Sequence, residues 1–275
     1  MIKQFSHYKD TSIFYNHTLF DSPSDHNFEL HTHDICELLF LKSGDVSGVI
    51  GGKTYKLQKN NLIIFRPQVT HRIHIDSQIP YERFNILFDE KIIANKAFEK
   101  IPKDLDIINY STNNYIIDIF KKLDFYCHHF YGNDLKKLTT NLIEEIIFNL
   151  TLVTTNNLNL DLISINPLIN QAVEYIDKNF TKQITIDDVS NELYISKSYL
   201  HQLFINNFEI SPKKYINSKR LAKAQNMIRM GIKPYNAYLR CGFSDYATFY
   251  RNYKQHFGHT PSEELNTKLE REIKS

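Results

Sequence analysis

The sequence predicts an α+β protein of two domains, in which a β-rich domain with a helical pair is followed by an all-α domain. Three observations support this prediction. Short runs of β-branched and aromatic residues, separated by glycine and proline turns, fill residues 28–88. Two segments with helical periodicity occupy 113–153, and helix caps and glycine stops recur beyond them. We therefore place the domains at 1–155 and 167–275, with a polar linker at 156–166.

Composition narrows the class of protein. A chain of 275 residues is long enough for about two hydrophobic cores, and 42% hydrophobic with 23% charged residues is typical of soluble globular proteins. No apolar run approaches the length of a membrane span, and residues 1–30 show no signal peptide. Cys36, Cys127 and Cys241 are odd in number and widely spaced, which favours neither a disulfide framework nor a zinc finger. We expect a cytoplasmic protein with no membrane partner.

The first domain is expected to be a β-sandwich or a small β-barrel. Residues 1–27 lack a clear period and predict an arm or a loose first strand, and the strand-like pattern begins at Phe28. Gly51-Gly52 is a strong signal for a tight hairpin turn. Strands are expected at Glu37–Leu41, Val46–Ile50, Lys53–Leu57 and Leu62–Phe65, around Ile73 and Ile75, and at Phe84–Phe88.

Three histidines and a glutamate stand out in this β-rich region. His31 and His33 are two residues apart, so on a strand they face the same side, and Glu37 joins that face if the strand continues regularly. His71 follows the turn at Pro67. Three imidazoles and a carboxylate can hold a divalent transition metal, line a pocket for a small effector, or form an inert polar cluster. The residues alone leave these alternatives open.

Two helices with apolar stripes are expected at 113–130 and 134–153, separated by a break at Gly132-Asn133. In the simpler interpretation both stripes pack on the β-domain. In the other, the outer face forms a homodimer interface, since twofold dimers are the commonest oligomers.

The second domain begins with a predicted helix-turn-helix. Thr185 and Asp188 predict a capping box that opens a helix ending at Leu193. Ser196 is the predicted cap of the next helix, which has one apolar and one polar face. A long connecting helix is then expected from Pro212 to Met230, with proline at its first position and Gly231 as its stop.

A second helix-turn-helix is predicted near the C-terminus. Cys241–Phe243 is a glycine turn, and Ser244 is the predicted cap of the following helix. Phe249, Tyr253 and Phe257 recur every four residues and so share one face of that helix. On geometry alone, an ordinary helical hairpin with a solvated polar face fits equally well.

The residues of this second unit resemble the C-terminal signature of the AraC/XylS family of transcription regulators. The matching residues are Gly242–Asp245, Phe249, Arg251, Tyr253–Lys254, Phe257–Gly258 and Thr260–Pro261. The order of the preceding helices matches the family layout, so the resemblance covers 167–265. Residues from 167 onward carry a net charge of +5 against −3 for the rest of the chain, which suits a nucleic-acid-binding domain.

A weaker resemblance extends into the first domain. The spacing of His31, His33 and Glu37 resembles the first cupin motif, and Pro67 with His71 resembles the second. The second motif departs from the metal-binding form, with Asn61 and Val69 in place of glycines and a spacing one residue short. In regulators of this family the cupin-like domain more often holds a small effector without metal. The resemblance therefore implies an effector site at His31, His33, Glu37 and His71, with no metal and no cofactor.

The resemblance implies a sequence-specific DNA-binding regulator that responds to a small molecule, with a sugar as one candidate. Double-stranded DNA, the effector and a second copy of the chain are the expected partners. The resemblance is compatible with contact with RNA polymerase and with action as an activator, and the residues leave activation and repression open as alternatives. The alternative is a metal-dependent cupin enzyme with an accessory DNA-binding module. We expect no enzyme, because the chain has neither a Gly-X-Ser-X-Gly elbow nor a phosphate-binding glycine loop.

Carried over residue by residue, the resemblance also implies which side chains meet DNA. These are Lys197, Ser198, His201 and Gln202 in the first unit, and Tyr246, Ala247, Tyr250, Arg251 and Lys254 in the second. Arg251 is the leading candidate for base contact, because a guanidinium can bind guanine O6 and N7 together. A phosphate contact or an internal salt bridge is the alternative for Arg251.

Four positions depart from the family pattern. Glu209 stands where glycine usually follows the first recognition helix, and a left-handed cap there would cost about 1 kcal/mol. Ile205 replaces a lysine and removes one phosphate contact. Tyr238, with Pro234 before it, occupies a position that is usually alanine, where two helices approach closely. We therefore expect the second unit to form, with a packing angle of its own.

Overall fold

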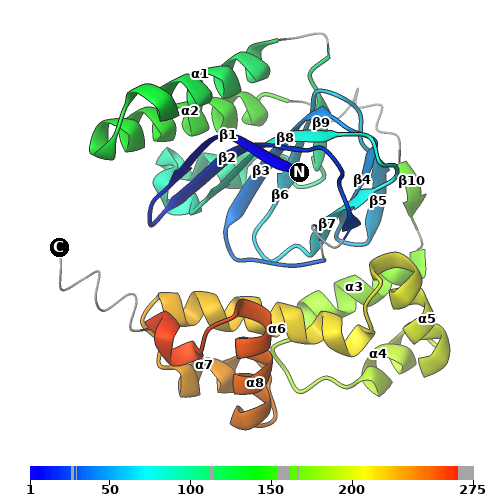
Figure 1. Ribbon diagram of the computed structural model, residues 1–275. Coiled ribbons are helices and arrows are strands. Elements are labelled where there is room, and N and C mark those ends of the chain that lie inside the picture. Colours follow the sequence, from blue (N-terminus) through cyan, green and yellow to red (C-terminus); the bar gives the residue numbers. More distant parts are fainter. Residues whose placement is uncertain (26–27, 29, 112–113, 154–161, 166, 266–275) are drawn as a thin grey trace.

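In the computed structural model, a β-rich domain lies against a helical domain (Figure 1). The structure describes all residues except 26–27, 29, 112–113, 154–161, 166 and 266–275. The strands are β1 (Ile2–Lys9), β2 (Ile13–Phe20), β3 (Cys36–Ser43), β4 (Val46–Ile50), β5 (Lys53–Lys56), β6 (Asn61–Phe65), β7 (His71–Ile75), β8 (Tyr81–Phe88), β9 (Ile107–Asn109) and β10 (Leu162–Ile165). Two short 3₁₀ segments, η2 (Glu90–Ile92) and η3 (Ala94–Lys100), follow β8. Among the described helices, none is both long and apolar enough to cross a membrane.

The strands form two antiparallel sheets. One has six strands in the order β1-β2-β8-β3-β6-β9, and the other has four in the order β10-β5-β4-β7. The predicted hairpin is confirmed: β4 and β5 pair through Gly51 and Gly52, whose φ angles of 53° and 92° are those of a left-handed two-residue turn.

Of the two architectures expected for this domain, a β-sandwich or a small β-barrel, the structure has the sandwich. Within the described residues, no strand of one sheet is hydrogen-bonded to a strand of the other, so the domain is an open sandwich of two sheets. Sequence alternation does not separate these two architectures, because a barrel and a sandwich place alternate residues inward in the same way.

The first residues of the chain were also predicted wrongly. Residues 1–27 contain two full strands, β1 and β2, instead of a loose arm, and β1 is an edge strand that faces solvent along most of its length. Conversely, residues from Phe28 to Ile35 form no regular strand among those described, and β3 begins only at Cys36. The apolar alternation of β2 is hidden by His17, a buried polar residue on its apolar face.

The middle of the six-stranded sheet is buried on both faces, which explains its continuous apolar sequence. In β3, Leu38 and Phe40 belong to the core beneath the helical pair, whereas Leu39 and Leu41 belong to the core between the sheets. Glu37 alternates with Leu38 and so faces the space between the sheets. This placement brings a carboxylate into the interior of the domain.

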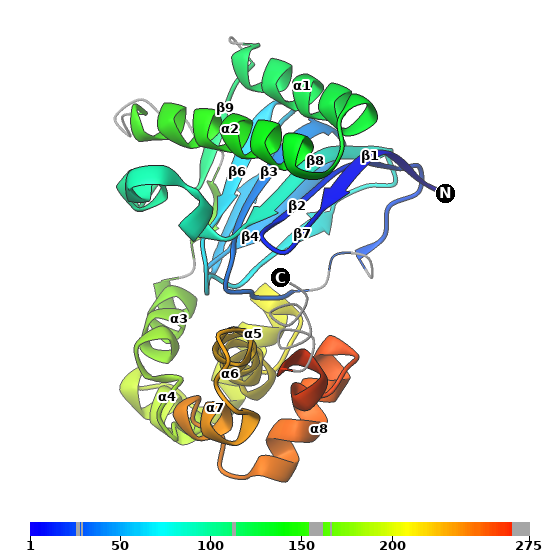
Figure 2. The ribbon, with the colours of Figure 1, turned by 90° about the vertical axis from the view of Figure 1, so that its left-hand side faces the viewer.

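Two helices cover the outer face of the six-stranded sheet, α1 (Tyr115–His129) and α2 (Gly132–Thr151) (Figure 2). Both confirm the predicted helical pair. Their inner faces share one core with the sheet, to which α1 contributes Phe120 and α2 contributes Ile146. The prediction that the pair packs on the β-domain is therefore confirmed for these inner faces.

The helical domain contains α3 (Pro167–Asn179), α4 (Ile186–Glu192), α5 (Lys197–Phe208), α6 (Pro212–Arg229), α7 (Pro234–Arg240) and α8 (Tyr246–Phe257), and residues 261–265 are again helical. Figure 1 shows α6 running between the unit α4–α5 and the unit α7–α8. The two predicted helix-turn-helix units and their connecting helix are thus confirmed. Its 18 residues make α6 about 27 Å long at 1.5 Å per residue.

Most predicted caps are confirmed. The Thr185 side chain accepts a hydrogen bond from the Asp188 backbone in a full capping box, and Ser196 and Ser211 cap α5 and α6. The cap of α8 is Asp245 instead of Ser244, because its Oδ1 accepts the Thr248 amide at 2.7 Å. Asp and Ser are both good caps, so the sequence did not distinguish them.

The two units are fastened to each other near Gly242, whose φ of 79° requires the left-handed region. A Cβ atom at this position would lie 2.7–2.9 Å from the carbonyl oxygens of residues 180–182. The Arg220 guanidinium of α6 donates to two of the same carbonyls, those of Phe180 at 2.7 Å and Lys182 at 2.8 Å. The turn of the second unit therefore rests on the loop that precedes α4.

The predicted linker at 156–166 lies mostly outside the described residues. Its described part, Leu162–Ile165, forms β10 and pairs antiparallel with β5 instead of being structureless. Pairing with an exposed edge strand is a tertiary contact that polar composition does not reveal.

Candidate functional site

A cavity of about 240 Å³ lies between the two sheets of the first domain. Strands from both sheets supply its walls, and its polar lining is concentrated on β2, β3, β7 and β8. The polar lining residues are Asn16, His31, Glu37, His71, Arg72, Arg83 and Asn85. The apolar ones are Phe14, Phe28, Leu39, Phe65, Ile73 and Leu87. An apolar cavity with a few inward-facing polar groups is the usual form of a small-molecule site.

Several polar atoms of this cavity have no partner within the described part of the chain. They are Asn16 Oδ1, Asn85 Oδ1, Arg83 Nε and Arg72 Nε. Leaving a buried donor or acceptor unpaired costs about 1–3 kcal/mol, so native proteins rarely bury several such atoms together without a purpose. Asn16 and Asn85 are paired across β2 and β8, so their amides lie side by side.

The four predicted site residues come together at one wall of this cavity. His31, His33, Glu37 and His71 each offer one ligand atom, and these atoms all lie within 4.8 Å of one another. The strand that was expected to align His31 with His33 is absent, and that expectation is wrong. His31 instead forms an isolated backbone bridge with His71, and His33 lies in the loop before β3.

Glu37 is the centre of the cluster and is only 4% exposed. Its Oε2 lies 2.7 Å from His33 Nε2 and 3.2 Å from His71 Nε2. Burial alone would raise the pKa of Glu37, but the two imidazoles hold this pKa well below its usual range. The carboxylate therefore remains ionised in a water-poor site.

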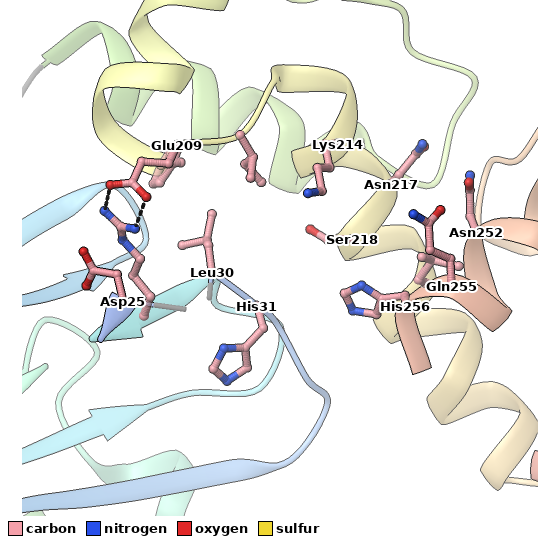
Figure 3. A pocket seen from close by; sticks show the side chains of 14 residues that line it. Asp25, Leu30, His31, Glu209, Lys214, Asn217, Ser218, Asn252, Gln255 and His256 are labelled. Carbon is pink, nitrogen blue, oxygen red and sulfur yellow. Dashed lines mark hydrogen bonds and ion pairs between the residues drawn. The ribbon is translucent and has the colours of Figure 1, made fainter. Parts of the chain in front are cut away.

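A second, larger space of about 740 Å³ separates the two domains (Figure 3). From the first domain it is lined by Asp25, Leu30, His31 and Arg72, and from the second by Phe208, Glu209, Ile210, Lys214, Asn217, Ser218, Leu221, Asn252, Gln255 and His256. His31 and Arg72 line both this cleft and the interior cavity. These two residues therefore form the wall between the cavity and the helical domain.

Arg72 joins the two domains directly. Its guanidinium binds both carboxylate oxygens of Glu209 at 2.9 and 2.8 Å, the ion pair that the dashed lines at Glu209 mark in Figure 3. The hydrogen bond from Arg72 lowers the pKa of Glu209. Glu209 has the left-handed φ of 59° that was expected for this position, at the C-terminus of α5. Glutamate at position 209, where the family usually has glycine, thus forms an ion pair with Arg72 that glycine could not form.

A second link lies beside the first. Lys219 of α6 is almost fully buried, and its Nζ donates to the backbone carbonyl of Gln68 at 2.7 Å and to Asp177 at 2.6 Å. Gln68 in turn donates its backbone amide to the carbonyl of His33. The connecting helix therefore contacts the loop that precedes His71 and that is hydrogen-bonded to His33.

The predicted DNA-contacting residues lie away from these links. Six are exposed near the N-terminal ends of α5 and α8: Lys197, Ser198, His201, Gln202, Ala247 and Arg251. Lys254 is exposed one turn further along α8. The C-terminal half of α8 also faces the interdomain cleft, through Asn252, Gln255 and His256. Each recognition helix thus has one end against the first domain or the cleft and the other end in solvent.

Three of the predicted DNA contacts have other interactions as well. Lys197 forms an ion pair with Asp187 of α4. Tyr246 is half-buried, its ring centroid 5.4 Å from that of Tyr238, and Tyr250 is half-buried beside it. The aromatic cluster around Tyr238 fills the space where alanine was expected. Arg251 is exposed, and its guanidinium donates a long hydrogen bond of 3.4 Å to Thr248 Oγ1.

Comparison with known proteins identifies both domains. Residues 18–97 match the model of the AraC-like ligand binding domain, and residues 189–267 match a helix-turn-helix domain. The chain belongs to the AraC family of transcription regulators. It is 23% identical over 256 residues to the lactose operon transcription activator of Staphylococcus xylosus, covering 92% of this chain and 86% of that one. It is 24% identical over 247 residues to the transcriptional activator RhaS of Escherichia coli, covering 86% of each.

Solved structures of similar proteins include apo ToxT of Vibrio cholerae, with 14% identity, a TM-score of 0.41, and coverage of 94% of this chain and 98% of that one. A probable AraC family regulator of Rhodopseudomonas palustris is 32% identical with a TM-score of 0.35, covering 38% of this chain and 98% of that one.

Sequence reasoning missed Arg72, Asn16, Asn85 and Arg83. All four are polar residues in β-strands, but only Asn85, between Phe84 and Ile86, has apolar neighbours on both sides, so alternation was a signal at that position alone. Glu209 was noted only as a departure from the family pattern. Its unfavourable backbone conformation was a signal that some compensating contact should exist.

Proposed function

We propose that this AraC family regulator binds a small polar effector in the cavity between its sheets. The observation that carries this proposal is the set of unpartnered polar atoms on Asn16, Asn85 and Arg83, which line the same cavity. Hydroxyl groups can donate to the amide oxygens and accept from the guanidinium. A monosaccharide is the leading candidate, supported by the size of the cavity and by the lactose operon activator among the relatives.

The effector would act on DNA binding through Arg72. This side chain has its Nε at the cavity and its terminal nitrogens on Glu209, at the end of the first recognition helix. A ligand that binds the Arg72 guanidinium in place of Glu209 would weaken the Arg72–Glu209 ion pair. A ligand that fixes the Arg72 side chain in its present position would strengthen that ion pair. Either change alters the freedom of α5 relative to the first domain.

We further propose that α5 and α8 read adjacent major grooves, with Ser198, His201 and Gln202 near one and Arg251 near the other. The length of α6 supports this arrangement, because about 27 Å approaches the ~34 Å between successive major grooves on one face of DNA. Lys254 and Lys197 would bind phosphates.

A homodimer is proposed through the outer face of the helical pair. Phe125 and Phe148 are 53% and 43% exposed there, and Tyr131 and Leu152 at the helix ends are 77% and 79% exposed. Two tethered helical domains would gain avidity for paired half-sites. Contact with RNA polymerase, action as an activator, a cytoplasmic location and the absence of enzymatic activity are inferred from the regulators to which the chain is similar.

The effector proposal is tested by thermal unfolding of the full chain against a panel of mono- and disaccharides and small polyols. At least one should raise the unfolding temperature and change the affinity for promoter DNA. Asn85→Leu should abolish that response, whereas Asn109→Ala, an exposed position of the same domain, should leave it intact. A panel without any response, or an equal response in Asn85→Leu, would contradict the proposal.

A further inference from the structure

We propose that His31, His33, Glu37 and His71 bind one divalent transition-metal ion of the zinc class at the wall of the effector cavity. These four side chains do not include Arg72 or Glu209, which form the ion pair between the domains. The proposed metal site therefore belongs to the cavity and not to the domain boundary. This inference deepens the proposed function, because the ion would present part of its coordination sphere to the effector.

The first argument is the orientation of two imidazole rings. His33 Nδ1 lies 2.9 Å from the carbonyl oxygen of Ile35, and His71 Nδ1 lies 2.8 Å from that of Val69. A carbonyl oxygen only accepts hydrogen bonds, so Nδ1 carries the hydrogen in both rings. In the neutral form of each ring, Nε2 therefore holds a lone pair.

Both lone pairs are directed at another acceptor. His33 Nε2 and His71 Nε2 converge on the same oxygen, Glu37 Oε2, at 2.7 and 3.2 Å. Three acceptors that face one another repel unless something positive lies among them. One cation bound by all three atoms removes this repulsion.

The three imidazole rings lie close together beside this carboxylate. The ring centroids of His33 and His71 are 4.8 Å apart, and His31 lies 4.5 Å from His71 by the same measure. One divalent ion accepts the lone pairs of both rings and the carboxylate at once.

The supporting interactions are those of a metal centre. Histidines that bind metals usually donate their other ring N–H to a backbone carbonyl or a carboxylate, which fixes the tautomer and the ring orientation. Both Ile35 and Val69 accept in this way. Phe65 stacks on the His71 ring at 4.0 Å and 13°, which holds that ring further. Two mutual backbone hydrogen bonds tie His31 to His71.

The donor set points to the class of metal and of ligand. Imidazole nitrogens with one carboxylate suit Zn²⁺ and its first-row neighbours better than Mg²⁺ or Ca²⁺, which prefer oxygen donors. The four ligand atoms lie within 4.8 Å of one another. To form metal–ligand bonds of about 2.0–2.2 Å, the side chains must move slightly closer together. Because His31, Glu37 and His71 line the cavity, any remaining coordination position faces it, where a hydroxyl or carboxylate of the effector can bind.

The test is metal uptake by the full chain without an affinity tag, with no effector or DNA added. Chelator-treated protein dialysed against Zn²⁺ should retain one equivalent per chain. Substitution with Co²⁺ should give a visible absorption band of a nitrogen- and oxygen-coordinated ion. Glu37→Gln should weaken Co²⁺ binding at least tenfold, and His33→Ala, at a less buried position, should do the same.

Two controls make the outcome decisive. His7→Ala removes an exposed histidine of the same domain and should keep the full equivalent. His74→Ala tests a competing set of possible ligands, Asp25, His74 and Glu209, at the domain boundary. The proposal is overturned if the wild-type chain retains no ion, or if Glu37→Gln retains it while His74→Ala loses it. A chain that binds a sugar but no metal would overturn only this inference and leave the proposed function standing.

Discussion

Arg72 and Glu209, 137 residues apart in sequence, form a two-pronged ion pair across the boundary between the two domains. Arg72 follows His71 in β7, and Glu209 ends the first recognition helix in a left-handed conformation. A side chain in that conformation costs about 1 kcal/mol relative to glycine. The ion pair offsets this cost, which explains why glutamate is acceptable where a regulator of this family usually has glycine.

The strength of this pair is measurable by a double-mutant cycle. Arg72→Met keeps most of the apolar stem, and Glu209→Gln keeps the size of the side chain. Because the Glu209 side chain is 56% exposed, solvent screening limits the pair, and we expect a coupling energy of about 1 kcal/mol in urea unfolding of the full chain.

The same cycle should depend on pH. Since the folded state lowers the pKa of Glu209 below its ordinary value of 4.5, the stabilisation is fully present above that pH and is lost as the pH falls through the lower, folded value. The difference between wild type and Arg72→Met should therefore shrink in acid. A coupling energy near zero at pH 7, or one that grows on acidification, would show that the pair does not hold the domains together.

Gly242 and Gly258 offer a matched pair of substitutions. Both have left-handed φ angles, 79° and 77°, so alanine is strained at each. At Gly258 no described atom lies within 4 Å of the added Cβ, and Gly258→Ala should cost about 1 kcal/mol. At Gly242 the Cβ would meet three backbone carbonyl oxygens, so Gly242→Ala should cost at least about 2 kcal/mol. Equal losses by urea unfolding would refute the close approach of the two helix-turn-helix units.

Local sequence signals predicted local structure well. The Gly51-Gly52 hairpin, the Thr185–Asp188 capping box and the Ser211 cap each depend on residues within a few positions of one another, and all three are confirmed. β2 was missed because one of its buried positions is His17. That histidine is satisfied only from far away in sequence, by Asp124 at 2.8 Å and Glu82 at 2.9 Å.

In the candidate site, too, the sequence indicated the residues but not the tertiary contacts between them. The four cluster residues were found from their chemistry and spacing, although the strand that was expected to carry His31 and His33 does not exist. Their meeting depends on the backbone bridge between His31 and His71, which is a tertiary contact. Nothing near Arg72 in the sequence indicates Glu209, because the pair forms only once the two domains pack together.

The helical pair should carry the dimer interface. Phe148→Asp, on the exposed face of α2, should shift the full chain from dimer to monomer in light scattering at tens of micromolar. Glu144→Ala on the same helix, which removes charge without adding it, should leave the mass unchanged. A wild-type chain that is monomeric under these conditions would contradict the dimer proposal.

Arg251 and Lys254 lie on one helix and should have different roles. If Arg251 binds a guanine edge, Arg251→Ala should cost about 1–3 kcal/mol on a specific site and relax preference at one base pair. Lys254→Ala should weaken all duplexes about equally and lower the salt slope by about one unit. Titrations at several salt concentrations on specific and scrambled duplexes separate the two. If Arg251→Ala weakens both duplexes alike, its side chain binds the backbone.

The most direct test of the central claim is footprinting of the full chain on genomic fragments that it selects. The two recognition helices and the length of α6 predict, for each chain, two protected segments in adjacent major grooves on one face of the DNA, about 10 base pairs apart. Arg251→Ala should lose the contact in only one of these segments. Protection that shows no preferred sequence, or that covers a single groove and is unchanged in Arg251→Ala, would contradict the account of a regulator that reads DNA with both units.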